Sequence, residues 1–496
     1  MTGQVKMDYQ AKDYQTYFAG EWRESESGRR FAVYSPVTGE QIGTVPEGSR
    51  ADVQQAVHTA GNSWQSWAKK TAFERAAILE NAAGIVTQRR DEMAYILTLE
   101  QGKPLHHEAY VEVDEVIAYL RMVAADVTRL EGHIVASTDP QKRVFVTRVP
   151  RGVVGAISPW NWPYTMPVEL IVPALGTGNA VVWACAPTTS ITAIMLAGCL
   201  VDAGIPKGVF NLLTGYGAVV GDEIAVNPGV HTVGFIGSVA TGMQVARQAA
   251  GKELLLELGG NGPLIILEDA DLDRAVDATL LGSFLCAGQS CTAAELILVH
   301  ESVKKTYLEK LLAKTREKIH LGDPFQPQTT MGPLQNAKTA EKMDAHIRDA
   351  VARGARIAAG GSRAQGFPTD LYYQPTILDH VNSDMIVSGE ETFGPIVPVQ
   401  TIRSDAEAVE IATRSGYGLT IALFTEDLRR GMLMAEELRS GTVVINDSTN
   451  WFEYHIAFGG GAGTKSGFGR VGGRFGYERF TELKTIFVDM SHRKSD

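Results

Sequence analysis

Apolar positions in the first third of the chain recur at helical spacing. A serine that can cap a helix, Ser49, stands before the first run, and both runs follow the i, i+3, i+4, i+7 pattern of one helix face. The apolar positions are Val53, Ala56, Val57 and Ala60 in the first run, and Ile78, Ala82, Ile85 and Val86 in the second. The pattern predicts a mainly helical region over residues 49–129.

Beyond this region the pattern shifts to short strands. Residues 143–149 alternate between apolar and polar, which predicts a half-exposed strand. Short apolar strands then alternate with helical stretches such as residues 189–203. These strands are predicted at 152–157, 180–183, 209–213, 232–235 and 254–258. Such alternation predicts a parallel, doubly wound sheet, which binds ligands beyond the carboxyl ends of its strands.

The second half of the chain repeats this organisation. Residues 263 to about 445 again alternate between strand and helix patterns, which predicts another α/β domain. A Gly-rich stretch follows, and residues 481–489 read as one more strand. The length of 496 residues is itself typical of roughly three domains.

Composition narrows the class of protein. The chain is 44% hydrophobic and 21% charged, as is typical of soluble globular proteins, and its net charge of −11 argues against nucleic acid or anionic membranes as partners. Four cysteines do not make a disulfide framework in so long a chain, so we expect a reducing, cytoplasmic compartment. No apolar run is long enough to span a membrane, and the N-terminus lacks the apolar core of a signal peptide. We expect no metal site.

The most informative residues are a thiol and a carboxylate. Cys291 is flanked by small residues in Gly-Gln-Ser-Cys-Thr-Ala, so a substrate carbonyl could approach it closely. Glu257 lies at a predicted strand end, before two glycines where the backbone must turn. A thiol nucleophile and a base that activates water suffice for covalent catalysis. Taken alone, the two residues are also compatible with a packed thiol and a solvated carboxylate.

A possible phosphate site follows the predicted strand 232–235. No G-x-G-x-x-G fingerprint follows any strand, but Gly237, Ser238 and Gly242 open a helix, whose first amides attract phosphate. An ordinary strand-to-helix turn explains this segment equally well.

Several motifs occur in the order found in the aldehyde dehydrogenase superfamily, which the chain resembles over nearly its whole length. A set in this order is far more specific than any one member. The motifs are Glu100-Gln-Gly-Lys-Pro104, Pro159-Trp-Asn-Trp-Pro163, Gly237-Ser238 with Gly242, Glu257-Leu-Gly-Gly260, Gly288-Gln-Ser-Cys291, Glu391-Thr-Phe-Gly-Pro395 and Phe458-Gly-Gly460.

The resemblance implies a reaction and assigns roles in it. Cys291 matches the nucleophile that forms a thiohemiacetal and then a thioester, and Glu257 matches the base that activates water to hydrolyse the thioester. Asn161 matches the side chain that forms an oxyanion hole with the Cys291 N–H. Glu391 and Phe393 match residues at the nicotinamide ribose and ring, and Ser238 matches a pyrophosphate contact. The cofactor set carried over is Trp160, Gly237, Ser238, Gly242, Glu391 and Phe393.

The residues expected near the substrate do not define it. Trp162, Met166, Trp451 and Phe452 could line the entrance and would favour an apolar or aromatic aldehyde, but each could equally be a packing residue. No clear Arg cluster near residues 447–460 marks a substrate carboxylate. The remaining cysteines are expected to be packing residues, and they are Cys185, Cys199 and Cys286.

The chain departs from the family pattern at four positions. Ala184 stands where the family usually has a Lys at the adenosine ribose, and Pro187 stands where NAD-preferring members often have Glu. Neither usual ribose contact is available, so cofactor choice is open, and we expect NAD with NADP possible. Leu296 replaces a common Arg, and Ala457 replaces a common Pro.

The resemblance implies an α/β fold of the aldehyde dehydrogenase type, with two doubly wound domains and a small β oligomerisation domain. We expect a cofactor-binding domain over 1–131 and 151–259, a catalytic domain over 260–459, and a bridging domain over 132–150 and 472–496. The expected protein is a homodimer or homotetramer that oxidises an aldehyde to a carboxylic acid. Two alternatives are a CoA-acylating relative, against which Glu257 argues, and a binding protein of this fold that has lost catalysis, which Ala184 and Leu296 leave open.

Overall fold

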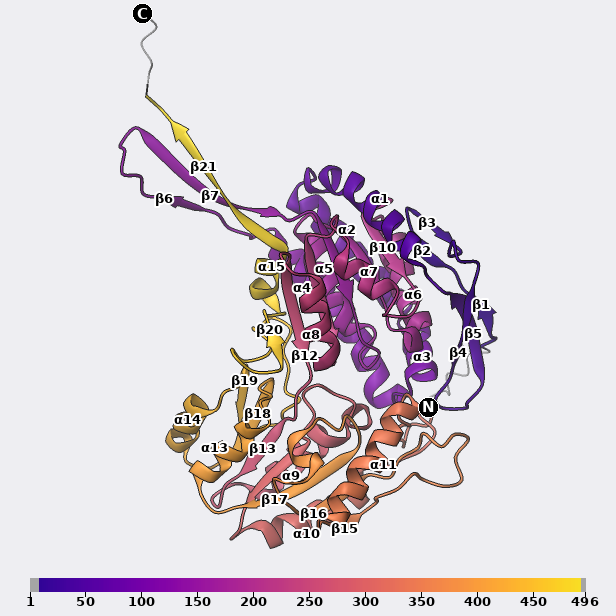
Figure 1. Cartoon of the computed structure of the whole chain (residues 1–496), viewed down its shortest axis with the longest axis vertical. Helices are drawn as coiled ribbons and strands as arrows, with labels where there is room; N and C mark the ends of the chain where they lie inside the picture. The colour runs from indigo at the N-terminus through magenta and orange to yellow at the C-terminus, as the bar shows by residue number, and fades with distance from the viewer. Residues whose placement is uncertain (1–8, 492–496) are drawn as a thin grey trace, which may run out of the picture.

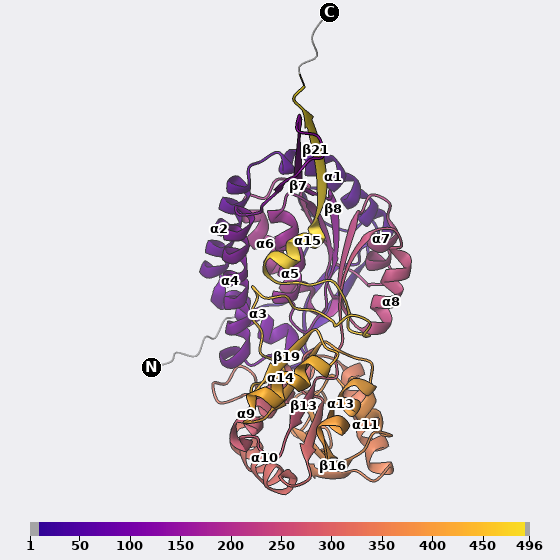
Figure 2. The ribbon, with the colours of Figure 1, turned by 90° about the vertical axis from the view of Figure 1, so that its left-hand side faces the viewer.

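Two lobes and a projecting arm make up the chain (Figure 1). The computed structural model describes residues 9–491; residues 1–8 and 492–496, the outermost parts of two predicted domains, lie outside the described residues. The first lobe contains a sheet of eight strands, and the second a sheet of seven. Turning the molecule by 90° shows the lobes stacked along the long axis, with the arm continuing beyond the first lobe (Figure 2).

The predicted helical region is confirmed. Ser49 caps the first helix in a capping box with Asp52, and Thr71 and Glu74 form a second box at the next helix. The helices of this region are α1 (Arg50–Ala68), α2 (Ala72–Gln88), α3 (Arg90–Gln101) and α4 (Tyr110–Val127), with a short π-helical turn at Leu105–Ala109 between the last two. Polar caps thus begin the first two helices where the sequence pattern places them.

The first sheet is parallel at its centre and covered by helices on both faces. Its order is β20-β12-β11-β8-β9-β10-β2-β3, and the five central strands are β8 (Val153–Ile157), β9 (Ala180–Ala184), β10 (Phe210–Leu213), β11 (Thr232–Gly237) and β12 (Glu253–Leu258). The helices that follow strands are α5 (Thr165–Gly176), α6 (Ser190–Asp202), α7 (Val220–Val226) and α8 (Val239–Gln248). Successive residues of β9 enter opposite cores: Val181 and Trp183 pack on the side of α2 to α6, and Val182 and Ala184 on the side of α1 and α7. Burial on both faces explains why these strands read as continuous apolar runs.

The edges of the first sheet come from distant segments. Strands β2 (Thr16–Phe18) and β3 (Glu21–Arg23) close one edge, and β20 (Gly467–Phe468) pairs with β12 at the other. A separate small sheet combines β1 (Lys12–Asp13), β4 (Arg30–Tyr34) and β5 (Gln41–Pro46).

The second sheet is also doubly wound. Its order is β15-β16-β17-β14-β13-β18-β19, and all strands are parallel except the edge strand β15. The strands are β13 (Pro263–Ile266), β14 (Leu296–His300), β15 (Arg356–Ala359), β16 (Thr376–Val381), β17 (Ile396–Ile402), β18 (Thr420–Phe424) and β19 (Thr442–Ile445). The helices are α9 (Leu272–Phe284), α10 (Lys304–Lys318), α11 (Ala337–Ala352), α12 (Ile386–Gly389), α13 (Asp405–Arg414) and α14 (Leu428–Glu437). The prediction of two doubly wound α/β units is confirmed.

Three strands build the arm. Strand β7 (Lys142–Pro150) pairs along its whole length with β21 (Thr481–Asp489), and β6 (His133–Val135) pairs with β7 on its other side. The arm leaves the first lobe (Figure 1). It exposes apolar side chains such as Ile134, Leu483 and Phe487. Residues Gly473–Phe480 form helix α15, which packs against α4 and α5 of the first lobe, so only the strand after it joins the arm. No helix within residues 9–491 has both the length and the apolar character that crossing a membrane requires.

Candidate active site

The main cavity lies where the two lobes meet. Its first wall comes from the carboxyl ends of three neighbouring strands, at the point where the strand order of the first sheet reverses. Trp160 and Asn161 follow β8, Gly237 ends β11 with Ser238 directly after it, and Glu257 lies on β12. The predicted location beyond the carboxyl ends of the strands therefore holds for this sheet.

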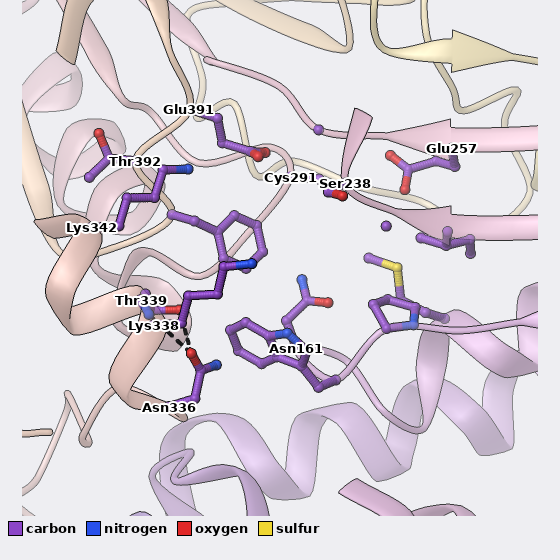
Figure 3. Close-up of a pocket in the computed structure, with 17 residues that line it drawn as sticks. Asn161, Ser238, Glu257, Cys291, Asn336, Lys338, Thr339, Lys342, Glu391 and Thr392 are labelled. Atoms are coloured by element: carbon purple, nitrogen blue, oxygen red, sulfur yellow. Dashed lines mark hydrogen bonds between the residues drawn. The ribbon is translucent and has the colours of Figure 1, made fainter. Parts of the chain in front are cut away.

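The second wall comes from the opposite edge of the other sheet. Cys291 precedes β14, and Glu391 and Phe393 precede β17, so these residues reach the cavity from the amino ends of their strands. Because β14 and β17 are hydrogen-bonded neighbours, segments 100 residues apart in the sequence enter one cavity. Figure 3 shows Glu257 and Asn161 on the side of the first lobe, facing the helix of the second lobe that carries Lys338 and Lys342.

Glycines in the motifs create the space for these side chains. A Cβ atom at Gly259 would collide with the Glu391 carboxylate, and one at Gly260 would collide with the Cys291 carbonyl. Gly288, at φ +72°, lies against the Gly394 carbonyl in the same way. The Glu-Leu-Gly-Gly and Gly-Gln-Ser-Cys motifs therefore fit together, since each leaves room for the backbone or side chain of another.

Glu257 and Cys291 form the reactive pair of the cavity. Neither carboxyl oxygen of Glu257 has a hydrogen-bond partner in the described part of the chain. Burial raises the pKa of Glu257 to about 8; the Cys291 thiol beside it offsets part of this shift, and the charge of Glu391 adds to it. Burial also raises the pKa of the Cys291 thiol well above its usual value, and the charges of Glu257 and Glu391 raise it further. The pair therefore rests as a protonated thiol beside a carboxyl group that, in its ionised form, can take up the proton of the thiol.

Asn161 points its amide toward the loop that carries the thiol. Its side chain is 3% exposed, and Nδ2 donates to the Gln289 carbonyl at 3.0 Å. A carboxamide nitrogen carries two hydrogens, so this bond leaves a second donor for another acceptor. Asn161 is thus hydrogen-bonded to the residue two positions before Cys291, and its amide keeps a second N–H that can donate to another acceptor.

A network of carboxylates fixes the residues before β17. Glu391 accepts the Gly260 N–H at 3.1 Å, and burial raises its pKa to about 7, partly offset by the charge of Lys342. Glu295, fully buried, accepts the backbone N–H groups of Thr392 and Phe393. Phe393 has φ +64°, which a non-glycine residue rarely adopts, and its ring stands edge-on to Trp160 at 5.5 Å between centroids. The two hydrogen bonds that Glu295 accepts hold this strained residue and the residue before it in place.

The other end of the cavity suits an anionic group. Ser238 is exposed at the N-cap of α8, and its hydroxyl accepts the Thr241 N–H. Gly242 lies on the buried face of this helix, where a side chain would collide with Leu258, so the glycine lets α8 approach β12. Lys338 and Lys342, one turn apart on α11, line the same cavity. A helix N-terminus and two ammonium groups fit the charge of a pyrophosphate.

Two of the four positions that depart from the family pattern, Ala184 and Leu296, are buried and well packed, whereas Pro187 and Ala457 are half-buried. Ala184 ends β9 with 2% of its surface exposed, packed in the same core as Val182 and Leu213. Leu296 is fully buried at the start of β14 among apolar neighbours, where it stabilises the hydrophobic core of the second lobe. The three cysteines expected to pack are buried free thiols, and burial raises the pKa of each one.

A second cavity lies on the other side of Cys291. Trp162, Met166 and Phe452, three of the four expected substrate residues, line it. The fourth, Trp451, is 52% exposed and lines neither cavity, because the loop turns its side chain to the surface. Two carboxylates that the sequence analysis did not single out, Glu115 and Glu169, line this cavity as well.

Some of the residues that were missed left a signal in the sequence. Glu295 follows Cys291 by four residues, and Lys338 and Lys342 stand at helical spacing. Glu115 and Glu169 left none, because they are 54 residues apart and meet only where α4 packs against α5. No group of three or more metal-ligating side chains occurs within residues 9–491. The chemistry that this site supports is thiol attack on a carbonyl, with a carboxylate base beside the thiol.

Comparison with known proteins agrees with the site. The model of the "Aldehyde dehydrogenase family" matches residues 22–486. The chain is 36% identical to a succinate-semialdehyde dehydrogenase [NADP(+)] of Escherichia coli, covering 96% of this chain and 98% of the relative, and 35% identical to a betaine aldehyde dehydrogenase of Bacillus subtilis, covering 95% and 97%. The crystal structure of a betaine aldehyde dehydrogenase from Staphylococcus aureus in complex with NAD+ superposes with a TM-score of 0.93 at 32% identity, covering 97% of this chain and 96% of that one.

Proposed function

This chain belongs to the aldehyde dehydrogenase family, and we propose that Cys291 is the nucleophile with which it oxidises an aldehyde to a carboxylic acid. The observation that carries the assignment is the buried, unpartnered Glu257 carboxyl beside the thiol in the main cavity. Glu257 would be the base and Asn161 an oxyanion donor.

The raised pKa of Cys291 decides how the first step begins. A neutral thiol is a weak nucleophile, so its proton must leave as the carbon–sulfur bond forms. Glu257 is the acceptor beside it, and the carbonyl oxygen of the aldehyde becomes an oxyanion. The free hydrogen of the Asn161 amide would stabilise this oxyanion, and losing one such donor typically costs about 3 to 4 kcal/mol of barrier.

NAD or NADP, when bound, supplies the hydride acceptor. In this chain Ser238 and the first turn of α8 would hold the pyrophosphate, with Lys338 and Lys342 adding positive charge. Glu391 would hold the nicotinamide ribose, with the rings of Phe393 and Trp160 near the nicotinamide. Gly237 and Gly242 would permit the close approach of backbone that this requires.

Hydrolysis returns Cys291 to its starting state. Glu257 would release the proton of the first step to solvent and then take a proton from a water molecule that attacks the acyl carbon. The Cys291 thiolate that leaves would recover this proton and become a thiol again. The presence of this base supports hydrolysis rather than transfer of the acyl group to an external thiol. Trp162, Met166 and Phe452 would line the path by which the aldehyde reaches the thiol.

The preference for NAD or NADP should depend on the residues beside the adenosine ribose of the cofactor. Ala184 offers no hydrogen bond to the ribose, and Pro187 offers no carboxylate to repel a 2′-phosphate. Because no cation stands at position 184, we propose that NAD is used in preference to NADP, with modest discrimination.

The exposed surface of the arm supports a proposal for how copies of the chain assemble, and the free cysteines support a proposal for its compartment. The arm presents a three-stranded sheet with exposed Ile134, Leu483 and Phe487, so we propose that it pairs with another copy of the chain in a homodimer or homotetramer. Four unpaired thiols are in keeping with a reducing cytoplasm as the place of work.

A direct assay tests the proposal. The purified protein is supplied with a panel of aldehydes and with NAD or NADP, and reduced cofactor is followed by its absorbance while the acid product is quantified. The expected result is one equivalent of acid for each reduced cofactor, and no product from Cys291→Ala. Formation of product by Cys291→Ala at a substantial rate would refute the covalent mechanism.

A further inference from the structure

The second cavity has an unusual lining for a site that binds an aldehyde. Its aromatic and apolar side chains, Trp162, Met166, Phe452 and Phe458, are interrupted by the carboxyl groups of Glu115 and Glu169. Cys291 lies on the wall of the same cavity, so a molecule held there has its aldehyde at the thiol. No Lys, Arg or His side chain lines this cavity within the described residues.

Glu169 is buried without a partner. It lies on α5 with 5% of its surface exposed, and it makes no hydrogen bond or ion pair with any residue between 9 and 491. A buried carboxyl group costs free energy unless something pairs with it. Glu115, on α4, accepts only the Thr165 hydroxyl at 3.0 Å. Both carboxyl groups therefore keep acceptor capacity for a ligand.

The nearby cation does not supply that partner. Lys103 is completely buried, pairs with Glu112 at 2.6 Å and lies over the Trp162 ring at 3.7 Å from the centroid. Glu112 in turn accepts the N–H groups of Tyr164 and Thr165 at the start of α5. Lys103 and Glu112 neutralise each other, so Lys103 does not neutralise Glu115 or Glu169. The cavity therefore keeps an excess of acidic groups.

We propose that this cavity selects an aldehyde that carries a positive charge, namely an ammonium or quaternary ammonium group a few bonds from the carbonyl. The aromatic rings would contact the cation through their faces, and the carboxylates of Glu115 and Glu169 would neutralise it. An aldehyde that carries a carboxylate would meet like charge and be rejected. This inference rests on the proposed function, because it places the substrate carbonyl at Cys291.

Selection should depend on pH. Burial raises the pKa of Glu115 to about 7, with Glu112 raising it further and Lys103 opposing, and burial raises that of Glu169 well above its usual value, with Glu257 and Glu115 adding to the shift. Bound cation favours the ionised forms, so affinity for a cation should rise as the pH rises through 7. Of the other titratable groups in this region, Glu257 and Cys291 act on every aldehyde alike, and Glu108 accepts the Cys286 N–H on the far side of Lys103. The ratio of the kcat/KM values for two aldehydes therefore reports on the ionisation of the cavity carboxyl groups alone.

Isosteric substrates provide the test. Trimethylammonioacetaldehyde and 3,3-dimethylbutanal have the same shape and differ in one positive charge, and 4-oxobutanoate carries a negative one. We expect kcat/KM, corrected for hydration of each aldehyde, to favour the cation over its neutral isostere by about tenfold or more at pH 8, which corresponds to about 1.4 kcal/mol. The ratio should shrink toward pH 6. The anion should be the poorest of the three.

Variants connect the preference to the carboxylates. Glu169→Gln and Glu115→Gln should lower the ratio of kcat/KM values toward one. Both variants should still oxidise 3,3-dimethylbutanal at a measurable rate, which shows that they fold. Glu410→Gln, an exposed residue of α13, removes the same charge elsewhere and should leave the ratio as in the parent. A parent that prefers the neutral isostere or the anion, or a ratio unchanged in both Gln variants, would overturn the inference.

A binding measurement separates this inference from the proposed function. Choline and its neutral isostere 3,3-dimethylbutan-1-ol are compared for their ability to slow the alkylation of Cys291 by iodoacetamide, which requires no turnover. Protection by choline, lost in Glu169→Gln, supports the cation site even if none of the aldehydes is oxidised. Equal protection by both alcohols, together with turnover, would reject the cation site and leave the oxidation of aldehydes standing.

Discussion

The pH dependence of the reaction should report the ionisation of Glu257. With a pKa of about 8, only about 9% of this carboxyl is ionised at pH 7, and about 90% is ionised at pH 9. Because the ionised form is the one that activates water, steady-state turnover should rise about tenfold over these two pH units. An ordinary glutamate, with its pKa near 4.5, would show no such rise.

Glu257→Gln separates the two halves of the reaction. The variant keeps the size of the side chain and keeps Cys291. The thiol proton must now pass to water instead of Glu257, so the first turnover should be slower than in the parent but should still appear as a burst of reduced cofactor in stopped-flow absorbance. Its amplitude should approach one per active site, and the steady state that follows should be slow and flat between pH 7 and 9. Glu390→Gln, an exposed residue outside the cavity, is the matched control and should behave like the parent. A parent profile that is flat from pH 7 to 9, or a variant with the parent steady-state rate, would refute the reasoning.

The same pKa shift predicts an effect on stability. The folded protein holds the Glu257 proton more tightly than the unfolded chain does, so the free energy of unfolding should fall as the pH rises from about 4.5 to about 8. This contribution is fully present below pH 4.5 and is lost above pH 8. Glu257→Gln has no proton to lose, so denaturant titrations should find it increasingly stable relative to the parent toward pH 8, by on the order of a few kcal/mol.

Three further changes test other parts of the site. Cys291→Ala should abolish oxidation of the aldehyde without changing the melting temperature or cofactor binding, whereas Cys286→Ala should retain most of the oxidation rate. The reverse result would identify Cys286 as the nucleophile. Gly259→Ala should displace the Glu391 carboxylate and weaken cofactor binding, measured by fluorescence titration, and unchanged affinity would show that Glu391 does not hold the cofactor. Ala184→Lys should increase the binding affinity for NADP more than that for NAD, by at most about a hundredfold, and the gain should shrink as the salt concentration rises. Equal cofactor affinities in parent and variant would mean that position 184 does not face the ribose.

Local patterns in the sequence determined the elements, and the ordered motifs identified the reactive groups of the cavity. Ser49 starts α1 because its hydroxyl and the Asp52 carboxylate satisfy free N–H groups at a helix start, an interaction confined to four residues. Alternation over residues 143–149 and the strand pattern at 481–489 predicted two strands of the arm for similarly local reasons. The ordered motifs further pointed to Cys291, Glu257 and Asn161, all of which line one cavity.

Only the tertiary structure decided what surrounds those residues. The second wall comes from the amino ends of its strands, which no local pattern marks, and Trp451 turns outward because of how its loop packs. The pKa of Glu257 depends on burial by both lobes, and the acidic lining depends on helices α4 and α5 bringing Glu115 and Glu169 together. Burial, charge and shape at a site are sums over distant segments, so the sequence identified the reactive groups, whereas the packing of the lobes set their ionisation and the shape of the substrate cavity.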